Sequence, residues 1–329
     1  MIWEKERSGI INRMINLDFL FEEIALELFY YQAKLNKVYK EYLELIHVDA
    51  SRINNIHDIP FLPISVFKSH LITTGEYIPR KVFSSSGTTD RSRSKHLIRD
   101  TDLYHRISAL CFLDAFEHSI DQTIHIGILP SYTTNSDSSL LFMLDYFIKK
   151  GGGNYFHRDP IGLVDYIGLN QNKIKFLWGV SYALLNWKYS FPVVPNLQII
   201  ETGGMKGMQQ EITRSELHEK IKGNFLQDSI ASEYGMTELL SQSYALKDGI
   251  FKFSPTLKVY PRSISDPLSP ERLNTTAALN IIDLANIDSC CFIATEDIGK
   301  VYHNQTFEVL GRLDNSDVRG CNLLITGKS

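Results

Sequence analysis

The sequence predicts an α/β protein whose parallel or mixed sheet is covered by helices and is followed by a smaller, β-rich part. Up to about residue 248, short apolar runs alternate with segments of helical periodicity, which is typical of helices packed on the faces of a sheet. Beyond Gly249 the helical segments stop and strand-like runs continue. The 329 residues, 43% of them hydrophobic and 22% charged, have the composition of a globular chain of one large or two ordinary domains.

These patterns predict the elements in chain order. Apolar residues from Ile24 to Leu45 recur at alternating steps of four and three, which predicts one long helix capped by Asn16 or Asp18. The prolines of DIPFLP, residues 58–63, then favour extended chain. Buried strands are predicted at 123–129, 174–178, 197–201 and 228–232, and helices at 101–118, 139–150, 180–187 and 209–222. The last strands are predicted at 250–253, 278–283, 290–294 and 306–309.

Charge and composition argue against several classes of protein. The net charge of −4 and the pI of about 6.2 leave no basic excess for nucleic acid. The longest apolar runs are too short to span a bilayer, and residues 1–13 lack the apolar stretch of a secretory signal. Four cysteines make no disulfide scaffold, and the histidines show no metal-ligand spacing with them. We therefore expect a reduced, cytoplasmic chain without a transmembrane segment or a zinc site.

Two glycine-containing segments could hold a ligand. In VFSSSGTT, residues 82–89, hydroxyls and free amides could bind phosphate oxygens, helped by Arg91, Arg93 and Lys95. A flexible surface loop is the alternative, and the spacing of a Walker loop is absent. In ETGGMKG, residues 201–207, two glycines after an apolar run would let a flat ring lie against the main chain, the alternative being a tight strand-to-helix turn.

Three later segments carry acids, an aromatic ring and a thiol. SEYGMTE, residues 232–238, could stack a base, contact a phosphate and ligate Mg²⁺, unless it is a polar loop with a core tyrosine. Asp297 of ATEDIG could accept both hydroxyls of a ribose or simply form a turn. In GRLDNSDVRGC, residues 311–321, Arg312 and Asp314 could pair, and Arg319 could activate the thiol of Cys321, which is otherwise an ordinary buried cysteine.

Taken in order along the chain, these segments resemble the motifs of the adenylate-forming superfamily, whose members join a carboxylate to AMP. Further segments resemble, more narrowly, the acyl-protein synthetase (LuxE-like) family of bacterial fatty-acid reductase systems. They are IPFLPISVFK at 59–68, LPSY at 129–132 with SSL at 138–140, IDLAN at 282–286 and RGC at 319–321. The resemblance covers the chain from about Asp58 onward and implies ATP and Mg²⁺ as cofactors.

The resemblance also implies roles for individual residues. The phosphates of ATP would be held by Ser85, Ser86, Gly87, Thr88 and Thr89. The adenine and ribose would be held by Gly203, Gly204, Tyr234, Gly235, Asp297 and Arg312. Thr237 and Glu238 would approach the phosphates, with Glu238 and Thr88 near Mg²⁺. Cys321 matches the cysteine that carries the acyl group in that family.

The chain departs from the superfamily in two ways. Asp90 follows the threonines where the superfamily usually has glycine, and the mobile C-terminal domain with its essential lysine is expected to be missing. A cation of the core would then have to serve adenylation, and the candidates are Lys95, Arg93 and Lys206. We expect an N-terminal helical segment at 1–80, an α/β nucleotide-binding core at 81–248, a β-rich subdomain at 249–311 and a tail with the candidate acyl-accepting cysteine at 312–329.

Three functions stay open. The first is an ATP-dependent acyl-protein synthetase, an acid–thiol ligase that acts on a fatty acid, with an acceptor protein or a reductase as partner. The second is an acyl- or aryl-adenylating ligase that transfers to coenzyme A or a carrier protein, for which Cys321 is dispensable. The third is a non-catalytic member that binds an acyl chain or a nucleotide. An acyl tunnel or plain core could be formed by Phe112, Phe116, Met143, Phe147 and Trp178.

Overall fold

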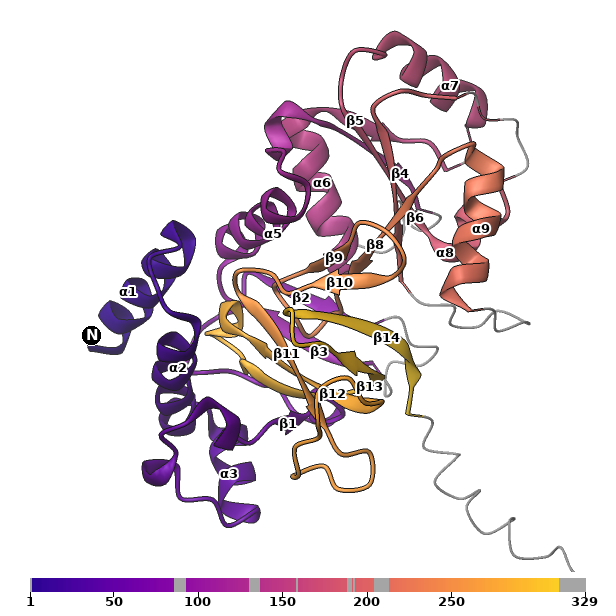
Figure 1. Ribbon diagram of the computed structural model, residues 1–329. Coiled ribbons are helices and arrows are strands. Elements are labelled where there is room, and N and C mark those ends of the chain that lie inside the picture. The colour runs from indigo at the N-terminus through magenta and orange to yellow at the C-terminus, as the bar shows by residue number, and fades with distance from the viewer. Residues whose placement is uncertain are drawn as a thin grey trace, which may run out of the picture.

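The computed structural model describes residues 2–85, 93–129, 137–157, 159–187, 191, 193–203 and 213–313. Figure 1 shows two sheets, with helices on both faces of the upper sheet and the N-terminal helices beside the lower one. The upper sheet has the order β5-β4-β6-β7-β8-β9 and is parallel except for β9. Its strands are β4 (Ile124–Ile128), β5 (Gly153–Tyr155), β6 (Lys175–Val180), β7 (Leu197–Thr202), β8 (Ile230–Tyr234) and β9 (Ser243–Ala245).

Helices cover this sheet because alternate residues of its strands are apolar on both faces. Trp178, Ile200 and Ala231 face one core, which α5 (Thr101–Phe116) and α6 (Ser139–Gly151) close. Their neighbours Leu177 and Ile199 face a second core. That core is closed by α7 (Pro160–Leu169), α8 (Ser181–Leu185) and α9 (Arg214–Phe225). The predicted α/β architecture is therefore confirmed, since strands buried on both faces need helices on both sides.

The lower sheet is antiparallel in its main path, which runs β10-β14-β13-β12-β11. Its strands are β10 (Ile250–Lys252), β11 (Leu257–Arg262), β12 (Ala277–Asp283), β13 (Phe292–Val301) and β14 (Thr306–Arg312), with β1 (Leu62–Pro63) pairing parallel to β13. A separate hairpin is formed by β2 (Lys81–Ser84) and β3 (Lys95–Ile98). Strand β10 lies beside β9, so the two sheets meet there (Figure 1).

The N-terminal part contains α1 (Ile2–Asn16), α2 (Phe21–Leu35) and α3 (Lys37–Leu45). The single long helix predicted from the apolar stripe is wrong, because the helix breaks at Asn36. The side chain of Asn36 accepts a hydrogen bond from the Tyr39 amide (3.0 Å) and so caps α3, while its amide group donates to the Ser289 carbonyl (2.8 Å). The cap predicted at Asn16 or Asp18 is also wrong, since the residue that precedes α2 is Leu20.

The short elements complete the described chain: α4 (Val66–Ser69) and the 3₁₀ turns η1 (Ala50–Arg52), η2 (Ile56–Asp58), η4 (Ile120–Gln122) and η5 (Leu284–Asn286). Turn η5 lies in the connection between β12 and β13. Side chains of the N-terminal helices donate hydrogen bonds to this connection. Arg7 of α1 donates two hydrogen bonds of 2.5 Å to the carboxylate of Asp288, and Gln32 of α2 donates to the carbonyls of Asn286 and Ile287. The N-terminal helices thus fix a connection that reaches the candidate site.

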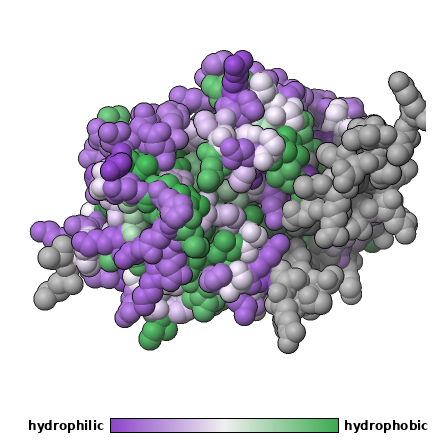
Figure 2. Space-filling view, turned by 90° about the horizontal axis from the view of Figure 1, so that it is seen from below, coloured by the Kyte–Doolittle hydropathy of each residue, from purple (hydrophilic) through white to green (hydrophobic). Residues whose placement is uncertain are grey.

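The aromatic residues proposed for an acyl tunnel pack against one another between α5, α6 and the upper sheet. The ring centroids of Phe112 and Phe147 lie 5.4 Å apart, and those of Phe147 and Trp178 lie 5.9 Å apart. Figure 2 shows hydrophilic and hydrophobic residues mixed over the face seen from below. Among the helices that the structure describes, none is long and apolar enough to cross a membrane.

Candidate functional site

Asp297 lies where the two sheets meet. It stands on β13 directly opposite Arg312 of β14, while Tyr234 is the last residue of β8 in the upper sheet. The hydroxyl of Tyr234 donates to Oδ2 of Asp297 (2.7 Å), and Nε of Arg312 donates to Oδ1 (2.9 Å). Asp297 is 4% exposed. Each carboxylate oxygen has one of these donors and can accept a further hydrogen bond from a ligand.

Both partners of Asp297 keep the protons that they donate to it. Burial, and next to it the Asp297 charge, raises the pKa of Tyr234 well above its ordinary value, so the phenol keeps its proton and donates. Burial lowers the pKa of Arg312, but Asp297 outweighs it and leaves that pKa raised. The Tyr234 ring packs against Phe251 and Phe307, at centroid distances of 5.7 and 5.3 Å. The carboxylate is thus oriented by donors from both sheets.

The segment after β8 is joined to the β2–β3 hairpin. Nδ1 of His96 on β3 donates to the carbonyl of Thr237 (2.8 Å). Burial lowers the pKa of His96 to about 4, so the ring is neutral at pH 7. The carbonyl of Glu238, which is 7% exposed, accepts from the amide group of Asn286 (2.8 Å). The segment with Thr237 and Glu238 is therefore held from two sides.

At the open end of the β2–β3 strand pair, Ser85 accepts two hydrogen bonds from the opposite strand's lead-in residues. Its hydroxyl accepts from the Ser94 amide (2.9 Å) and its carbonyl accepts from Nε of Arg93 (2.8 Å). Arg93 therefore stabilises the turn rather than standing free. Lys95 is exposed and pairs with Ser84 across the hairpin. The remaining residues of the predicted phosphate loop, Ser86, Gly87, Thr88 and Thr89, lie outside the described residues.

The end of β7 supplies an open glycine. Gly203 has a φ of 79°, which favours glycine, and a Cβ placed there would have no heavy atom of the described residues within 4 Å. The hydroxyl of Ser181 donates to the carboxyl group of Glu201 and also lies 3.1 Å from the Gly203 carbonyl oxygen. Burial raises the pKa of Glu201. Gly203 thus leaves room for a group to approach its backbone, while Gly204 and Lys206 lie outside the described residues.

The structure connects the predicted residues in two groups. The first joins Tyr234, Asp297 and Arg312, and the second joins the hairpin to the segment from Gly235 to Glu238. Gly235 and Tyr234 are consecutive, so the groups are continuous. Cys321 and Asp314 lie beyond the last described residue. In the part of the chain that the structure describes, no three His, Cys, Asp or Glu side chains form a metal cluster.

The sequence did not predict the residues whose side chains bind the backbone of the segment after β8. His96 carried no signal, because its partner is 141 residues away. Asp283 and Asn286 did lie in a segment singled out for its resemblance, IDLAN, although no role followed from it. Asp283 accepts hydrogen bonds from the amides of Leu240 and Ser241 (2.8 and 3.0 Å), just after Glu238.

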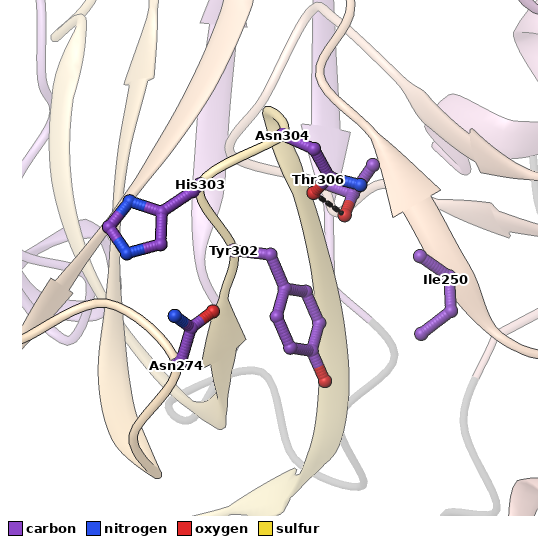
Figure 3. A pocket seen from close by; sticks show the side chains of 6 residues that line it. All are labelled: Ile250, Asn274, Tyr302, His303, Asn304 and Thr306. Atoms are coloured by element: carbon purple, nitrogen blue, oxygen red, sulfur yellow. Dashed lines mark hydrogen bonds between the residues drawn. The ribbon is translucent and has the colours of Figure 1, made fainter.

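A surface pocket of about 430 Å³ lies elsewhere, around the β13–β14 turn. Figure 3 shows its side chains, which are those of Ile250, Asn274, Tyr302, His303, Asn304 and Thr306. The hydroxyl of Thr306 donates to Asn304 (2.7 Å). None of the predicted site residues lines this pocket, so it is a separate feature.

Over about 70% of its length, the chain has the fold seen in solved structures of adenylate-forming enzymes. MatB from Rhodopseudomonas palustris, bound to ATP, superposes with a TM-score of 0.52 at 16% identity over 70% of this chain and 47% of that one. A malonyl-CoA ligase with methylmalonyl-CoA and AMP bound gives 0.51 at 16% identity over 71% and 53%. O-succinylbenzoate coenzyme A synthetase (MenE) from Bacillus subtilis, with ATP and a magnesium ion, gives 0.50 at 18% over 75% and 51%.

The chain thus spans about half the length of these structures. At such low identity the likeness concerns the fold. No protein-family model matches the sequence, and no curated protein matches it.

Proposed function

We propose that this chain activates a carboxylic acid, in the first place a fatty acid, with ATP and passes the acyl group to a thiol. In the first step a carboxylate oxygen bonds to the α-phosphorus while the bond from that phosphorus to the bridging oxygen breaks, releasing pyrophosphate. In the second step a thiolate bonds to the acyl carbon and AMP leaves. The observation that carries the proposal is the Asp297 carboxylate, held by Tyr234 and Arg312 at the junction of the sheets.

The residues present fit a nucleotide. Each Asp297 oxygen can accept one ribose hydroxyl, and the open backbone at Gly203 leaves room for a flat ring. Lys95 is exposed at the start of β3, next to Ser85 and Ser94. Ser94 is 1% exposed, and its hydroxyl has no hydrogen-bond partner in the described chain, so that hydroxyl can still bind a ligand oxygen.

Glu238 fits a magnesium ion bound with the phosphates, because Mg²⁺ is usually held by one or two carboxylates together with substrate oxygens. Thr88, the other candidate, lies outside the described residues. When bound, Mg²⁺ would neutralise charge on the phosphates. Asn286 and His96 hold the backbone carbonyls of Glu238 and Thr237 and so fix the segment that would present Glu238 to the ion.

Acid-dependent exchange of radioactive pyrophosphate into ATP tests the first step. We expect exchange with at least one acid from a panel of fatty and aryl acids. Asp297→Asn should lower kcat/KM for ATP about 100-fold, because charge-assisted hydrogen bonds contribute about 1.5–3 kcal/mol each. The exposed Asp266→Asn variant is the matched control and should retain the wild-type value. Intact nucleotide binding without exchange for any acid would instead support a non-catalytic, nucleotide-binding protein.

The thiol acceptor is tested separately by intact-mass spectrometry after incubation with Mg-ATP and the acid found by exchange. An acyl-protein synthetase should gain the mass of one acyl group, and Cys321→Ala should abolish the gain. The coenzyme A ligases among the structures of the same fold favour a second candidate acceptor. Pyrophosphate release that requires added coenzyme A and survives Cys321→Ala would establish that alternative.

A further inference from the structure

Three polar side chains lie side by side on one face of the upper sheet. The register pairs Thr202 of β7 with Glu233 of β8, and Glu233 with Tyr244 of β9. Directly paired residues point to the same face, so the three form what we call the polar row. Two residues earlier on β7 and β8 come Ile200 and Ala231, which belong to the core under α5 and α6. The polar row therefore lies at the carboxyl end of that core.

The polar side chains of this row lack hydrogen-bond partners within the described chain. Thr202 is 0% exposed and Tyr244 is 2% exposed, and neither hydroxyl has a hydrogen-bond partner there. The carboxyl group of Glu233 likewise makes no hydrogen bond to a described residue, although the residue is only half-buried. An unpaired buried hydroxyl destabilises a protein, so a hydroxyl kept in an otherwise apolar core points to a ligand.

The polar row leads from the core to the candidate site. Oε1 of Glu233 lies 2.3 Å from the point where a Cβ on Gly235 would stand, so the carboxyl group lies beside Gly235, two residues before Thr237. At the other strand, Thr202 is followed by the open Gly203. A molecule that reaches the polar row can therefore have its other end beside the proposed nucleotide.

The phenol groups near Glu233 differ in what they can still bind. Burial raises the pKa of both Tyr104 and Tyr244, and the charge of Glu233 adds to this in each case, so both hydroxyls lie near its carboxyl group. The Tyr104 hydroxyl already donates to the carbonyl of Ser139 (2.9 Å). The Tyr244 hydroxyl remains the donor available to a ligand.

We propose that the polar row binds a hydroxyl group on the chain of the acid that this protein activates. A hydroxyl both donates and accepts, which matches a carboxyl group between two hydroxyls. An ammonium group fits less well, because the Tyr244 ring lies among Phe116, Phe112 and Trp178, at centroid distances of 5.1, 6.3 and 6.3 Å, where a charge would lose its hydration. This inference rests on the proposed function and narrows its substrate to a hydroxylated aliphatic acid.

Burial, reinforced by the nearby Glu201, raises the pKa of Glu233 to about 8. At pH 7 the carboxyl group is therefore mostly neutral. A neutral carboxyl group can donate to a ligand hydroxyl as well as accept from it, which agrees with a neutral rather than a cationic ligand.

Pyrophosphate exchange with acids of equal length tests the proposal. The acids are decanoic, 3-hydroxydecanoic, 10-hydroxydecanoic and 10-aminodecanoic acid. We expect at least one hydroxy acid to exceed decanoic acid at least 10-fold in kcat/KM, and Thr202→Val and Tyr244→Phe each to reduce that ratio at least 5-fold. Ser289→Ala is the control, because it removes another buried hydroxyl without a described partner, in the β12–β13 connection, and should leave the ratio unchanged.

The melting temperature of the two variants distinguishes a ligand-binding role from a structural role. If the two hydroxyls serve a ligand, Thr202→Val and Tyr244→Phe should keep or raise the Tm of the ligand-free protein, since each removes an unpaired polar group. A lowered Tm in both variants would assign them a structural role and overturn the proposal. So would decanoic or 10-aminodecanoic acid matching the best hydroxy acid.

A binding experiment separates the proposed enzyme activity from the proposed binding of a hydroxyl group by the polar row. If no acid supports exchange, calorimetric binding of 3- and 10-hydroxydecanoate to the full chain decides the matter. Tighter binding than decanoate, lost in Thr202→Val and Tyr244→Phe, would uphold the polar row without the enzyme activity. Equal or no binding of the hydroxy acids would overturn it.

Discussion

Replacing Asp283 with alanine is expected to lower the free energy of unfolding by about 3–5 kcal/mol, because several buried hydrogen-bond donors lose their acceptor at about 1–3 kcal/mol each. Asp283 is 0% exposed. Its Oδ2 accepts from the amides of Leu240 and Ser241, and its Oδ1 accepts from the Ser241 hydroxyl (2.6 Å) and the Ala285 amide (3.1 Å). Urea denaturation at pH 7 measures the loss.

The effect is large because the Asp283 carboxyl group joins the segment at residues 240–241 to the start of the β12–β13 connection. Alanine would leave the buried amides of Leu240 and Ser241 without their acceptor, and each such group costs about 1–3 kcal/mol. The same substitution frees the segment that carries Glu238, so amide hydrogen exchange over residues 236–242 should become faster. Asp228→Ala, at an exposed position, should change stability by less than about 0.5 kcal/mol. A loss below about 1 kcal/mol for Asp283→Ala would contradict this account.

The fold could be predicted where a pattern repeats within one element. The run predicted at 123–129 corresponds to β4, Ile124–Ile128, in which isoleucine recurs at every second position and all five residues are buried. The break at Asn36 could not be predicted in this way. The apolar stripe continues through it, and one of the bonds that fix it goes to Ser289, 253 residues away.

The candidate site shows the same division. Tyr234, Asp297 and Arg312 each stood in a recognisable segment, and the residue types matched the chemistry. The bond from Tyr234 to Asp297 joins two sheets across 63 residues, and no local spacing encodes such a contact. The polar row was missed for a related reason. Thr202, Glu233 and Tyr244 become neighbours only through the register of three strands.

Buried titratable groups of opposite sign set the pH at which the protein is most stable. His96, His125 and His218 are 1%, 0% and 4% exposed, and burial lowers their pKa values to about 4, 3 and 4. For a lowered folded pKa, stability is present above the unfolded value of 6.5 and is lost as the pH falls. Glu233 has a raised pKa, so its contribution is present below 4.5 and is lost as the pH rises toward 8.

We therefore expect maximal stability near pH 6.5 and a steep loss below it. Each histidine loses about 1.4 kcal/mol per pH unit once the pH lies well below its unfolded pKa. Protonation of His125 is opposed by its partners, because Nδ1 accepts from the Trp178 indole (3.2 Å) and has no lone pair left for a proton. Urea denaturation from pH 7.5 to 4.5 measures the slope. His218→Gln should make the slope shallower by the contribution of one histidine, about 1.4 kcal/mol per pH unit. His303→Gln, at an exposed position, should not change it. A free energy of unfolding that stays constant from pH 6.5 to 5 would show that the buried imidazoles gain protons without opening the fold.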